Sequence, residues 1–145
     1  MKKIIMVILA VVAVISADFS RSSAFAVEEK PAISKVIAFY FHGSFRCPTC
    51  RKLEAYSKET ISTNFKYEID SGKLEFKEVN TEEKGNEHFV DEYQLYTKTL
   101  ILSLVKDGKE VKWKNLDKIW ELVGNKKKYA DYVTNAVSDL LKEAQ

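Results

Sequence analysis

The sequence predicts an α/β protein in which a central mixed β-sheet carries helices on both faces. Apolar runs of strand length alternate along the chain with segments whose apolar residues recur every three or four positions. The pair Asp107-Gly108 separates the last two strand-like runs. Strands that alternate with helices are joined by parallel crossovers, whereas a tight turn joins antiparallel strands, so both kinds of pairing are expected. The length of 145 residues suits one such domain.

Four strands are expected, and each has its own pattern. Residues 36–41 form a continuous apolar run, which is typical of a strand buried on both faces. Apolar residues between positions 74 and 79 mark a second strand, and residues 100–105 form a third. Residues 110–113 should pair with the third strand, because Asp107-Gly108 accepts the positive φ angles of a tight hairpin.

Four helical segments are predicted from residue spacing. The first begins at Pro48, since a first helical position needs no N–H, and it continues with a bend to Ile69. A short helix is expected between residues 86 and 94, and a third is expected to be capped by Asn115 and broken at Gly124-Asn125. Each predicted helix has an apolar stripe. In the first helix it is Cys50, Leu53, Ser57 and Ile61, and in the second it is Phe89, Val90 and Tyr93. In the third helix it is Leu116, Ile119, Trp120 and Val123, and in the last it is Tyr129, Val133, Ala136, Val137 and Leu140.

The N-terminal residues have the pattern of a secretory signal peptide. Lys2-Lys3 precede an apolar run over residues 4–15, and a polar stretch then ends in Ala24-Phe25-Ala26. This run is shorter than the roughly 20 residues that span a bilayer, although an uncleaved anchor remains the alternative. We predict a signal peptide over residues 1–26, a polar leader over residues 27–35, and a domain over residues 36–145. The domain would work in the periplasm or at the extracytoplasmic surface.

The distribution of charge argues against two classes of partner. The whole chain carries a net charge of +2, and residues 1–26 account for all of it, so residues 27–145 are neutral. Nucleic acids and anionic membranes are bound by surfaces with an excess of basic residues. We therefore expect no nucleic-acid partner, and contact with a membrane only through residues 1–26 if they are not cleaved.

The chemistry lies in Cys47-Pro48-Thr49-Cys50, which holds both cysteines of the chain. Because this segment follows a strand and begins a helix, the partial positive charge of the helix N-terminus stabilises a thiolate at Cys47, and Arg46 adds the same sign. Cys50, one turn further on, can close a disulfide with Cys47 and expel a mixed-disulfide partner. The pattern predicts that Cys47 attacks and Cys50 resolves, with their disulfide as the redox group and no separate cofactor.

Three other interpretations of the cysteine pair stay open. A structural disulfide across so short a loop would stabilise the fold by only ~2 kcal/mol. A zinc or copper carrier could use both thiolates with His42 and His88, although one cysteine pair lacks the repeated spacing of zinc modules. A non-catalytic adaptor would keep the fold and bind a partner without using the sulfurs.

The order of elements around the cysteines resembles the thioredoxin-like superfamily. The matching segments are residues 36–41, residues 47–50, Gly72-Lys73-Leu74, and residues 100–105 with Lys106-Asp107-Gly108. The resemblance implies a thioredoxin-like three-layer sandwich and an activity as a thiol–disulfide oxidoreductase on other thiol or disulfide proteins. Because an extracytoplasmic domain without a nucleotide site cannot draw on a soluble reductase directly, its electron partner is expected to be a membrane-embedded dithiol protein.

Two shorter segments are similar to a narrower group of small exported bacterial proteins. Tyr40-Phe41-His42-Gly43 stands before the cysteines, and residues 114–120 follow the hairpin. That group is labelled the nitrophenyl-compound nitroreductase subunit ArsF family. The sequence contains no glycine-rich nucleotide loop and no flavin-binding feature, so no residue predicts nitroreduction itself.

Two positions depart from the pattern of the superfamily. Thioredoxins resemble one another in a cis-proline before the third strand, which shapes the groove for substrate backbone; Lys98-Thr99 occupy that place and are the predicted groove residues. The buried acid about six residues before the first cysteine is replaced by Phe41, with Glu54 or His42 as candidate substitutes. The residues expected to tune the redox chemistry are Arg46, Pro48, Thr49, His42 and Glu54.

Overall fold

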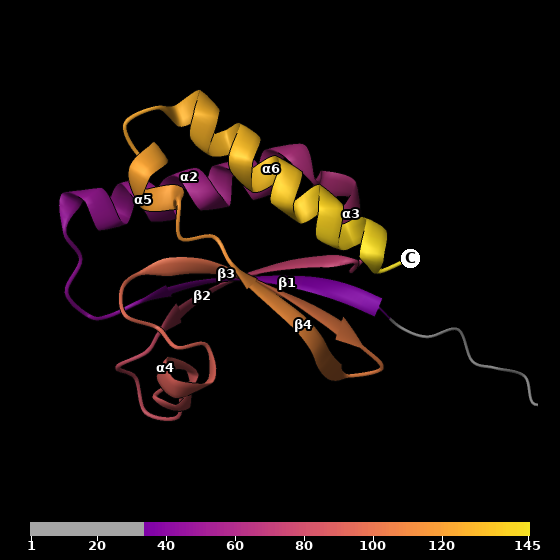
Figure 1. The fold of residues 1–145 in the computed structure, drawn as a ribbon, viewed down its shortest axis with the longest axis horizontal. Helices are drawn as coiled ribbons and strands as arrows, with labels where there is room; N and C mark the ends of the chain where they lie inside the picture. The colour runs from indigo at the N-terminus through magenta and orange to yellow at the C-terminus, as the bar shows by residue number, and fades with distance from the viewer. Residues whose placement is uncertain (1–33) are drawn as a thin grey trace, which may run out of the picture. The chain divides into compact units, whose positions relative to one another are not determined.

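The computed structural model describes residues 34–145, so the predicted signal peptide and most of the predicted leader lie outside the described residues. The elements follow one another along the chain as Figure 1 shows. They are β1 (Ser34–His42), α2 (Pro48–Asn64), α3 (Lys66–Asp70), β2 (Leu74–Asn80), α4 (His88–Glu92), β3 (Thr99–Lys106), β4 (Lys109–Asn115), α5 (Ile119–Leu122) and α6 (Lys126–Glu143).

The strands form one mixed sheet in the order β2-β1-β3-β4. β1 runs parallel to β2, with Val36 opposite Leu74, and α2 makes the crossover between them. β3 is antiparallel to β1, and β4 is antiparallel to β3. The predicted mixed sheet is confirmed, and this order of strands and connections is the thioredoxin-like fold that the resemblance implied.

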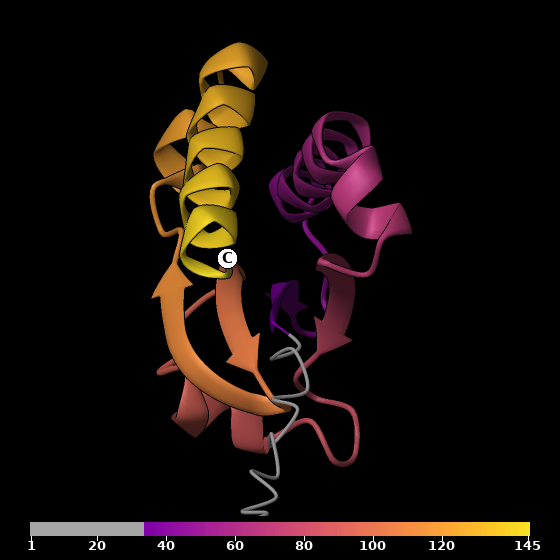
Figure 2. The same ribbon diagram turned by 90° about the vertical axis from the view of Figure 1, so that its right-hand side faces the viewer.

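Helices cover both faces of the sheet, with α2, α3, α5 and α6 on one side and α4 on the other (Figures 1 and 2). Successive side chains of a strand point to opposite faces, and β1 supplies both. Its residues Val36, Ala38 and Tyr40 join the core that contains α2 and α6. Phe39 and Phe41 join a smaller core around Tyr93, which directly follows α4. The predicted three-layer arrangement is therefore confirmed.

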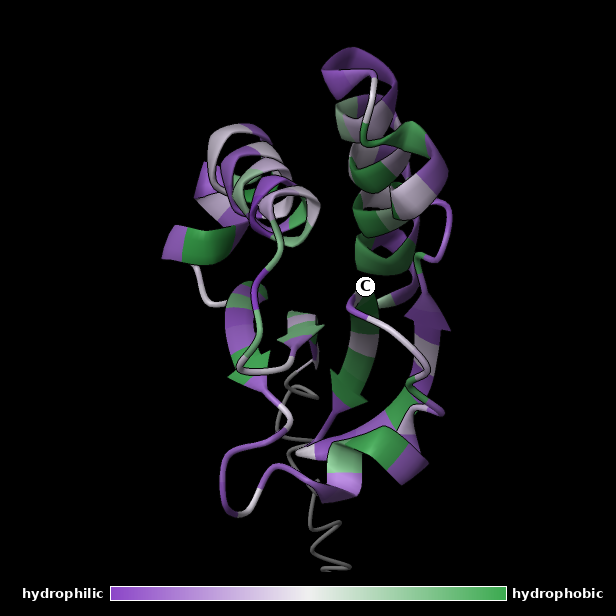
Figure 3. Ribbon diagram, turned by 90° about the vertical axis from the view of Figure 1, so that its left-hand side faces the viewer, coloured by the Kyte–Doolittle hydropathy of each residue, from purple (hydrophilic) through white to green (hydrophobic). Residues whose placement is uncertain are grey.

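The hairpin between β3 and β4 closes as the sequence predicts. Asp107 and Gly108 have φ angles of 51° and 78°, which is the left-handed region that a tight hairpin turn requires. β3 is buried over most of its length, whereas β4 is exposed, and Figure 3 shows β3 as mostly hydrophobic and β4 as mostly hydrophilic. Lysines along an edge strand discourage pairing with another chain, and β4 carries Lys109, Lys112 and Lys114.

Two predicted boundaries are wrong. β1 begins at Ser34, inside the predicted leader, because main-chain pairing with β3 extends to Ser34 opposite Lys106 regardless of side-chain polarity. Asn115 does not cap a helix: it is the last residue of β4, where its side-chain oxygen accepts a hydrogen bond of 2.5 Å from the Thr99 hydroxyl. The short helix α5 begins only at Ile119.

The predicted bend and last helix are confirmed, whereas Val90, which was predicted on the apolar face of the short helix, is 38% exposed. The predicted bend falls at Phe65, where φ is −128° and ψ is 33°, and it separates α2 from α3. α5 ends at Leu122, before the predicted break at Gly124-Asn125. Asn125 caps α6, since its side-chain oxygen accepts a hydrogen bond of 3.0 Å from the N–H of Lys128. All five apolar residues predicted for the last helix are buried. No helix within residues 34–145 is long and apolar enough to cross a membrane.

Leu53 is a point at which the packing of α2 can be tested. Its side chain is fully buried in the larger core. We expect Leu53→Ala to lower the free energy of unfolding by about 2–5 kcal/mol, because it removes buried methyl groups and leaves a cavity. Urea unfolding followed by circular dichroism measures the change. The control Ser62→Ala, at an exposed position of the same helix, should change it by less than about 0.5 kcal/mol; an equal loss would contradict the packing described.

Candidate active site

The two cysteines lie at the beginning of α2 and form a disulfide. Cys47 is the N-cap residue, with φ −69° and ψ 161°, and Pro48 occupies the first helical position. The N–H of Cys50 donates a hydrogen bond of 3.1 Å to the sulfur of Cys47. Cys47 is partly exposed, whereas only 2% of Cys50 is exposed. Cys47 is therefore the more accessible of the two cysteines, and the helix start offers an N–H group to its sulfur.

A cluster of charged and polar side chains lies beside the cysteines. The Arg46 guanidinium forms an ion pair with Glu54, and its Nη1 atom lies 3.1 Å from both ring nitrogens of His42. Arg46 and Glu54 are each about one-fifth exposed, at 20% and 21%. The structure thus brings together three of the predicted tuning residues. Glu54 therefore offsets the charge of Arg46, and the helix N-terminus adds a partial positive charge at Cys47.

The other two predicted tuning residues, Pro48 and Thr49, are exposed on the first turn of α2. Pro48 sets the backbone direction with which the helix begins, because its ring holds φ near −65°.

Two buried tyrosines lie under the first turns of α2, and the sequence analysis did not predict them as part of the site. The Tyr40 hydroxyl donates a hydrogen bond of 2.8 Å to the carbonyl oxygen of Cys50. The Tyr129 hydroxyl donates one of 3.0 Å to the carbonyl oxygen of Leu53 and lies 2.6 Å from the Ser57 hydroxyl oxygen. A buried tyrosine usually has a hydrogen-bond partner for its hydroxyl. The position of Tyr40 in a continuous apolar strand and of Tyr129 on an apolar helical stripe could therefore have indicated such partners.

Burial raises the pKa of both tyrosines above the ordinary value of 10.0. For Tyr129 the pKa rises to about 12, although the hydrogen bond with Ser57 opposes the rise. For Tyr40 the repulsion from Tyr129 adds to the effect of burial, and Arg46 opposes it. Both hydroxyls are therefore protonated at neutral pH and available as hydrogen-bond donors beneath the site.

Phe41, which occupies the place of the superfamily's buried acid, does not face α2. Its ring packs against Phe39 and Tyr93, with centroid distances of 5.5 and 5.4 Å, on the side of the sheet that α4 covers. Because side chains of a strand alternate, Tyr40 and His42 point to the side of α2 instead. His42 therefore contacts Arg46 beside the cysteines, as the sequence analysis allowed, whereas Phe41 supports the opposite core.

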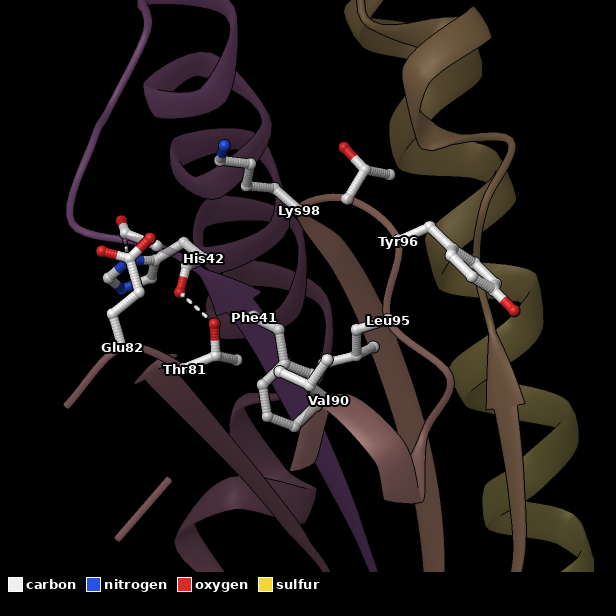
Figure 4. Close-up of a pocket in the computed structure, with 10 residues that line it drawn as sticks. Phe41, His42, Thr81, Glu82, Val90, Leu95, Tyr96 and Lys98 are labelled. Atoms are coloured by element: carbon white, nitrogen blue, oxygen red, sulfur yellow. Dashed lines mark hydrogen bonds between the residues drawn. The ribbon is translucent and has the colours of Figure 1, made fainter. Parts of the chain in front are cut away.

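The two predicted groove residues behave differently. Thr99 is only 2% exposed and donates its hydroxyl to Asn115, so its side chain is not available to a substrate. The carbonyl oxygen of Lys98 accepts a hydrogen bond of 2.7 Å from the indole N–H of Trp120, and residues 34–145 contain no cis peptide bond. The Lys98 side chain lines a cavity of about 160 Å³ together with His42 and Glu82 (Figure 4).

The metal-binding alternative is not supported. His88 lies on α4, where it pairs with Glu92 at 3.7 Å, and α4 covers the face of the sheet opposite to α2. His42 contacts Arg46, a cation that would oppose metal binding at the same ring. Within the described part of the chain, no three histidine, cysteine, aspartate or glutamate side chains gather as a metal site. The set of Cys47, Cys50, His42 and His88 is therefore not assembled.

The described residues have a thioredoxin-like fold with a disulfide in a Cys-x-x-Cys segment. No family model and no curated protein match the chain. Among solved structures it is similar to thioredoxin from Fasciola hepatica, with 20% identity over 70% of this chain and 80% of that chain and a TM-score of 0.39. Trxlp from Edwardsiella tarda EIB202 gives 15% identity, coverages of 68% and 82%, and a TM-score of 0.42. Oxidised thioredoxin from Plasmodium falciparum gives 18% identity, coverages of 66% and 82%, and a TM-score of 0.39.

The raised pKa of Tyr129 predicts how stability depends on alkaline pH. Below pH 10 the folded and unfolded chains both keep this proton, so its contribution to stability is fully present. As the pH rises from 10 toward 12, the unfolded chain loses the proton that the folded chain keeps. The free energy of unfolding should then fall by up to about 1.4 kcal/mol per pH unit for this group. In urea titrations at successive pH values Tyr129→Phe should show a shallower decline; an unchanged slope would contradict the assignment.

Proposed function

We propose that this protein is a thiol–disulfide oxidoreductase whose redox group is the Cys47–Cys50 pair. The observation that supports it best is the unequal placement of the two sulfurs, with Cys47 partly exposed as the N-cap of α2 and Cys50 buried one turn later. A low-pKa thiolate is favoured at a helix N-terminus, and a neighbouring buried thiol can complete the exchange without competing for the target.

The exchange proceeds in two balanced displacements. The Cys47 thiolate of the reduced protein attacks one sulfur of a target disulfide; that bond breaks, a mixed disulfide forms, and the other target sulfur leaves as a thiolate that takes up a proton. Cys50, after losing its proton, attacks the sulfur of Cys47, so that the mixed disulfide breaks and the Cys47–Cys50 bond forms. Two electrons have then passed to the target, and the second target sulfur is released.

The side chains around the pair have distinct parts in this proposal. Tyr40 holds the carbonyl group of Cys50, which steadies the first turn of α2 while the bond between the sulfurs opens and closes. Glu54 takes the place of the superfamily's buried acid, because it lies one turn after Cys50 and is drawn toward the site by Arg46. His42 completes the cluster from the end of β1.

A second dithiol or disulfide protein must restore the Cys47–Cys50 pair after each cycle. We infer that this partner is embedded in a membrane, in line with the export predicted from residues 1–26. The reduction potential decides the direction of the exchange: a value near about −120 mV is that of an oxidant and one near about −270 mV that of a reductant. The predicted resemblance to the ArsF family is not supported, because no family model matches the chain. The chemistry proposed here concerns sulfur and not a nitro group.

Substitution of each cysteine tests the proposal. We expect Cys47→Ser to abolish the protein-dependent reduction of a small peptide disulfide with dithiothreitol as electron source, because the other cysteine, Cys50, is buried and cannot reach the target disulfide. Cys50→Ser, reduced with dithiothreitol and freed of it before the peptide is added, should instead accumulate mixed disulfides with the peptide, since the resolving sulfur is missing. Mass spectrometry detects these adducts. A wild-type protein that reduces nothing, together with a Cys50→Ser variant that traps nothing, would favour the non-catalytic adaptor.

Export is proposed from the N-terminal pattern alone and can be tested separately. Expression of the full chain in a bacterium with a periplasm, followed by fractionation and N-terminal sequencing, should yield a protein that begins at Val27, because the predicted cleavage follows Ala26. A protein that stays in the cytoplasm at full length would contradict this proposal. Full-length protein in the membrane fraction would indicate an uncleaved anchor.

A further inference from the structure

The loop that presents Cys47 is fastened to the connection between β2 and α4. Residues 43–46 lead from the end of β1 to the cysteine. Within them the main-chain N–H of Ser44 donates a hydrogen bond of 3.0 Å to the Glu82 carboxylate, and the Ser44 hydroxyl accepts one of 3.1 Å from the Asn80 amide. Figure 4 shows Glu82 beside His42 at one side of the cavity. Two segments that lie 38 residues apart in sequence are thus joined three residues before the reactive sulfur.

Gly43 makes room for this contact. A Cβ atom built at Gly43 would overlap the Oε1 atom of Glu82 and lie 3.1 Å from its carboxyl carbon. The φ angle of Gly43 is not positive, so the glycine is needed for space and not for its conformational freedom. Since the atoms in the way belong to the end of a flexible side chain, a larger residue at position 43 would displace the Glu82 carboxylate from Ser44 without blocking the fold.

Glu82 is itself held in place from several sides. Its N–H donates a hydrogen bond of 3.1 Å to the Asn80 side chain, and the N–H of the preceding Thr81 donates one of 2.8 Å to the carbonyl oxygen of His42. The hydrogen bond from the Ser44 backbone lowers the pKa of Glu82, and the charges of Lys98 and His42 act in the same direction. A charged acceptor makes the stronger hydrogen bond to a backbone N–H.

We propose that Glu82 is a positioning residue for Cys47. Its carboxylate lies in the space left by Gly43 and accepts the hydrogen bond from the N–H of Ser44. Through this bond it sets where the attacking sulfur stands relative to an incoming disulfide, although it touches neither cysteine. The inference rests on the proposed function. Misplacement of a reacting group by about 1 Å can lower a rate by up to about 100-fold, so one hydrogen bond three residues from the sulfur has a measurable effect.

The test compares Glu82→Ala with Glu87→Ala, a matched control in the same connection. The Glu87 carboxylate also accepts a backbone N–H, that of Gly85 at 2.7 Å, but this bond stays within its own segment. Glu82→Ala should lower kcat/KM for peptide disulfide reduction about tenfold, which corresponds to one lost hydrogen bond to a charged group. Glu87→Ala should leave it within about twofold. Glu82→Gln, which keeps an acceptor oxygen, should recover most of the loss.

Gly43→Ala tests the contact between Glu82 and Ser44 from the other side. It should lower kcat/KM by a similar factor in the wild-type protein and have little further effect in the Glu82→Ala variant, because both changes remove the same contact. The rate of alkylation of reduced Cys47 by iodoacetamide should follow the same pattern, while the Tm values of all variants stay close together. Additive losses, or an equal loss in Glu87→Ala, would overturn the proposal.

The two proposals fail in different ways. If wild-type protein does not reduce disulfides but Glu82→Ala still changes the alkylation rate of Cys47, the proposed function fails and the positioning role stands. If the wild type is active and neither kcat/KM nor the alkylation rate responds to Glu82→Ala, the positioning role fails and the function stands.

Discussion

The N-terminus of α2 is the constraint on which the site depends. Between His42 and Pro48 the chain must leave a buried strand and begin a helix of 17 residues, and Cys47 is the residue at which the helix starts. Once α2 packs on the sheet through residues such as Leu53 and Ile61, the positions of both sulfurs follow. The sulfur of the N-cap residue meets the free N–H groups, and the one a turn later is carried inward with the apolar stripe. The position at which α2 begins therefore decides both the exposure of Cys47 and the burial of Cys50.

The polar groups around this helix start divide into a buried set and a rim. Tyr40 and Tyr129 lie in the core and hold carbonyl oxygens of the first turns of α2 with protonated hydroxyls. At the rim, Arg46 stands between Glu54 and His42, so its charge is shared within the cluster. The buried set gives rigidity, because an unpaired hydroxyl there would cost about 1–3 kcal/mol. The rim stays close enough to solvent to exchange protons.

Patterns within a single element were predicted well from the sequence. The apolar stripe of α6, the hairpin at Asp107-Gly108 and the bend near Phe65 depend on periodicity and on backbone angles, which neighbouring residues decide. The predicted cap at Asn115 was wrong because a strand can extend through a polar residue when its neighbour across the sheet offers main-chain partners. Here Asn115 stands opposite Ile101, and the N–H of Leu116 still donates to the carbonyl oxygen of Leu100 at 2.9 Å.

The sequence by itself determined that two sulfurs stand one turn apart at the start of a helix, because that arrangement needs only the spacing of the cysteines and a proline after the first. The tertiary structure alone decided that Tyr40 faces the helix while Phe41 faces away, that the carbonyl oxygen of Lys98 is occupied by Trp120, and that Glu82 reaches Ser44. These contacts depend on strand register and on the packing of α2 against the sheet. The whole fold decides which remote segments come into contact, so these contacts cannot be predicted from the residues near each position in the sequence.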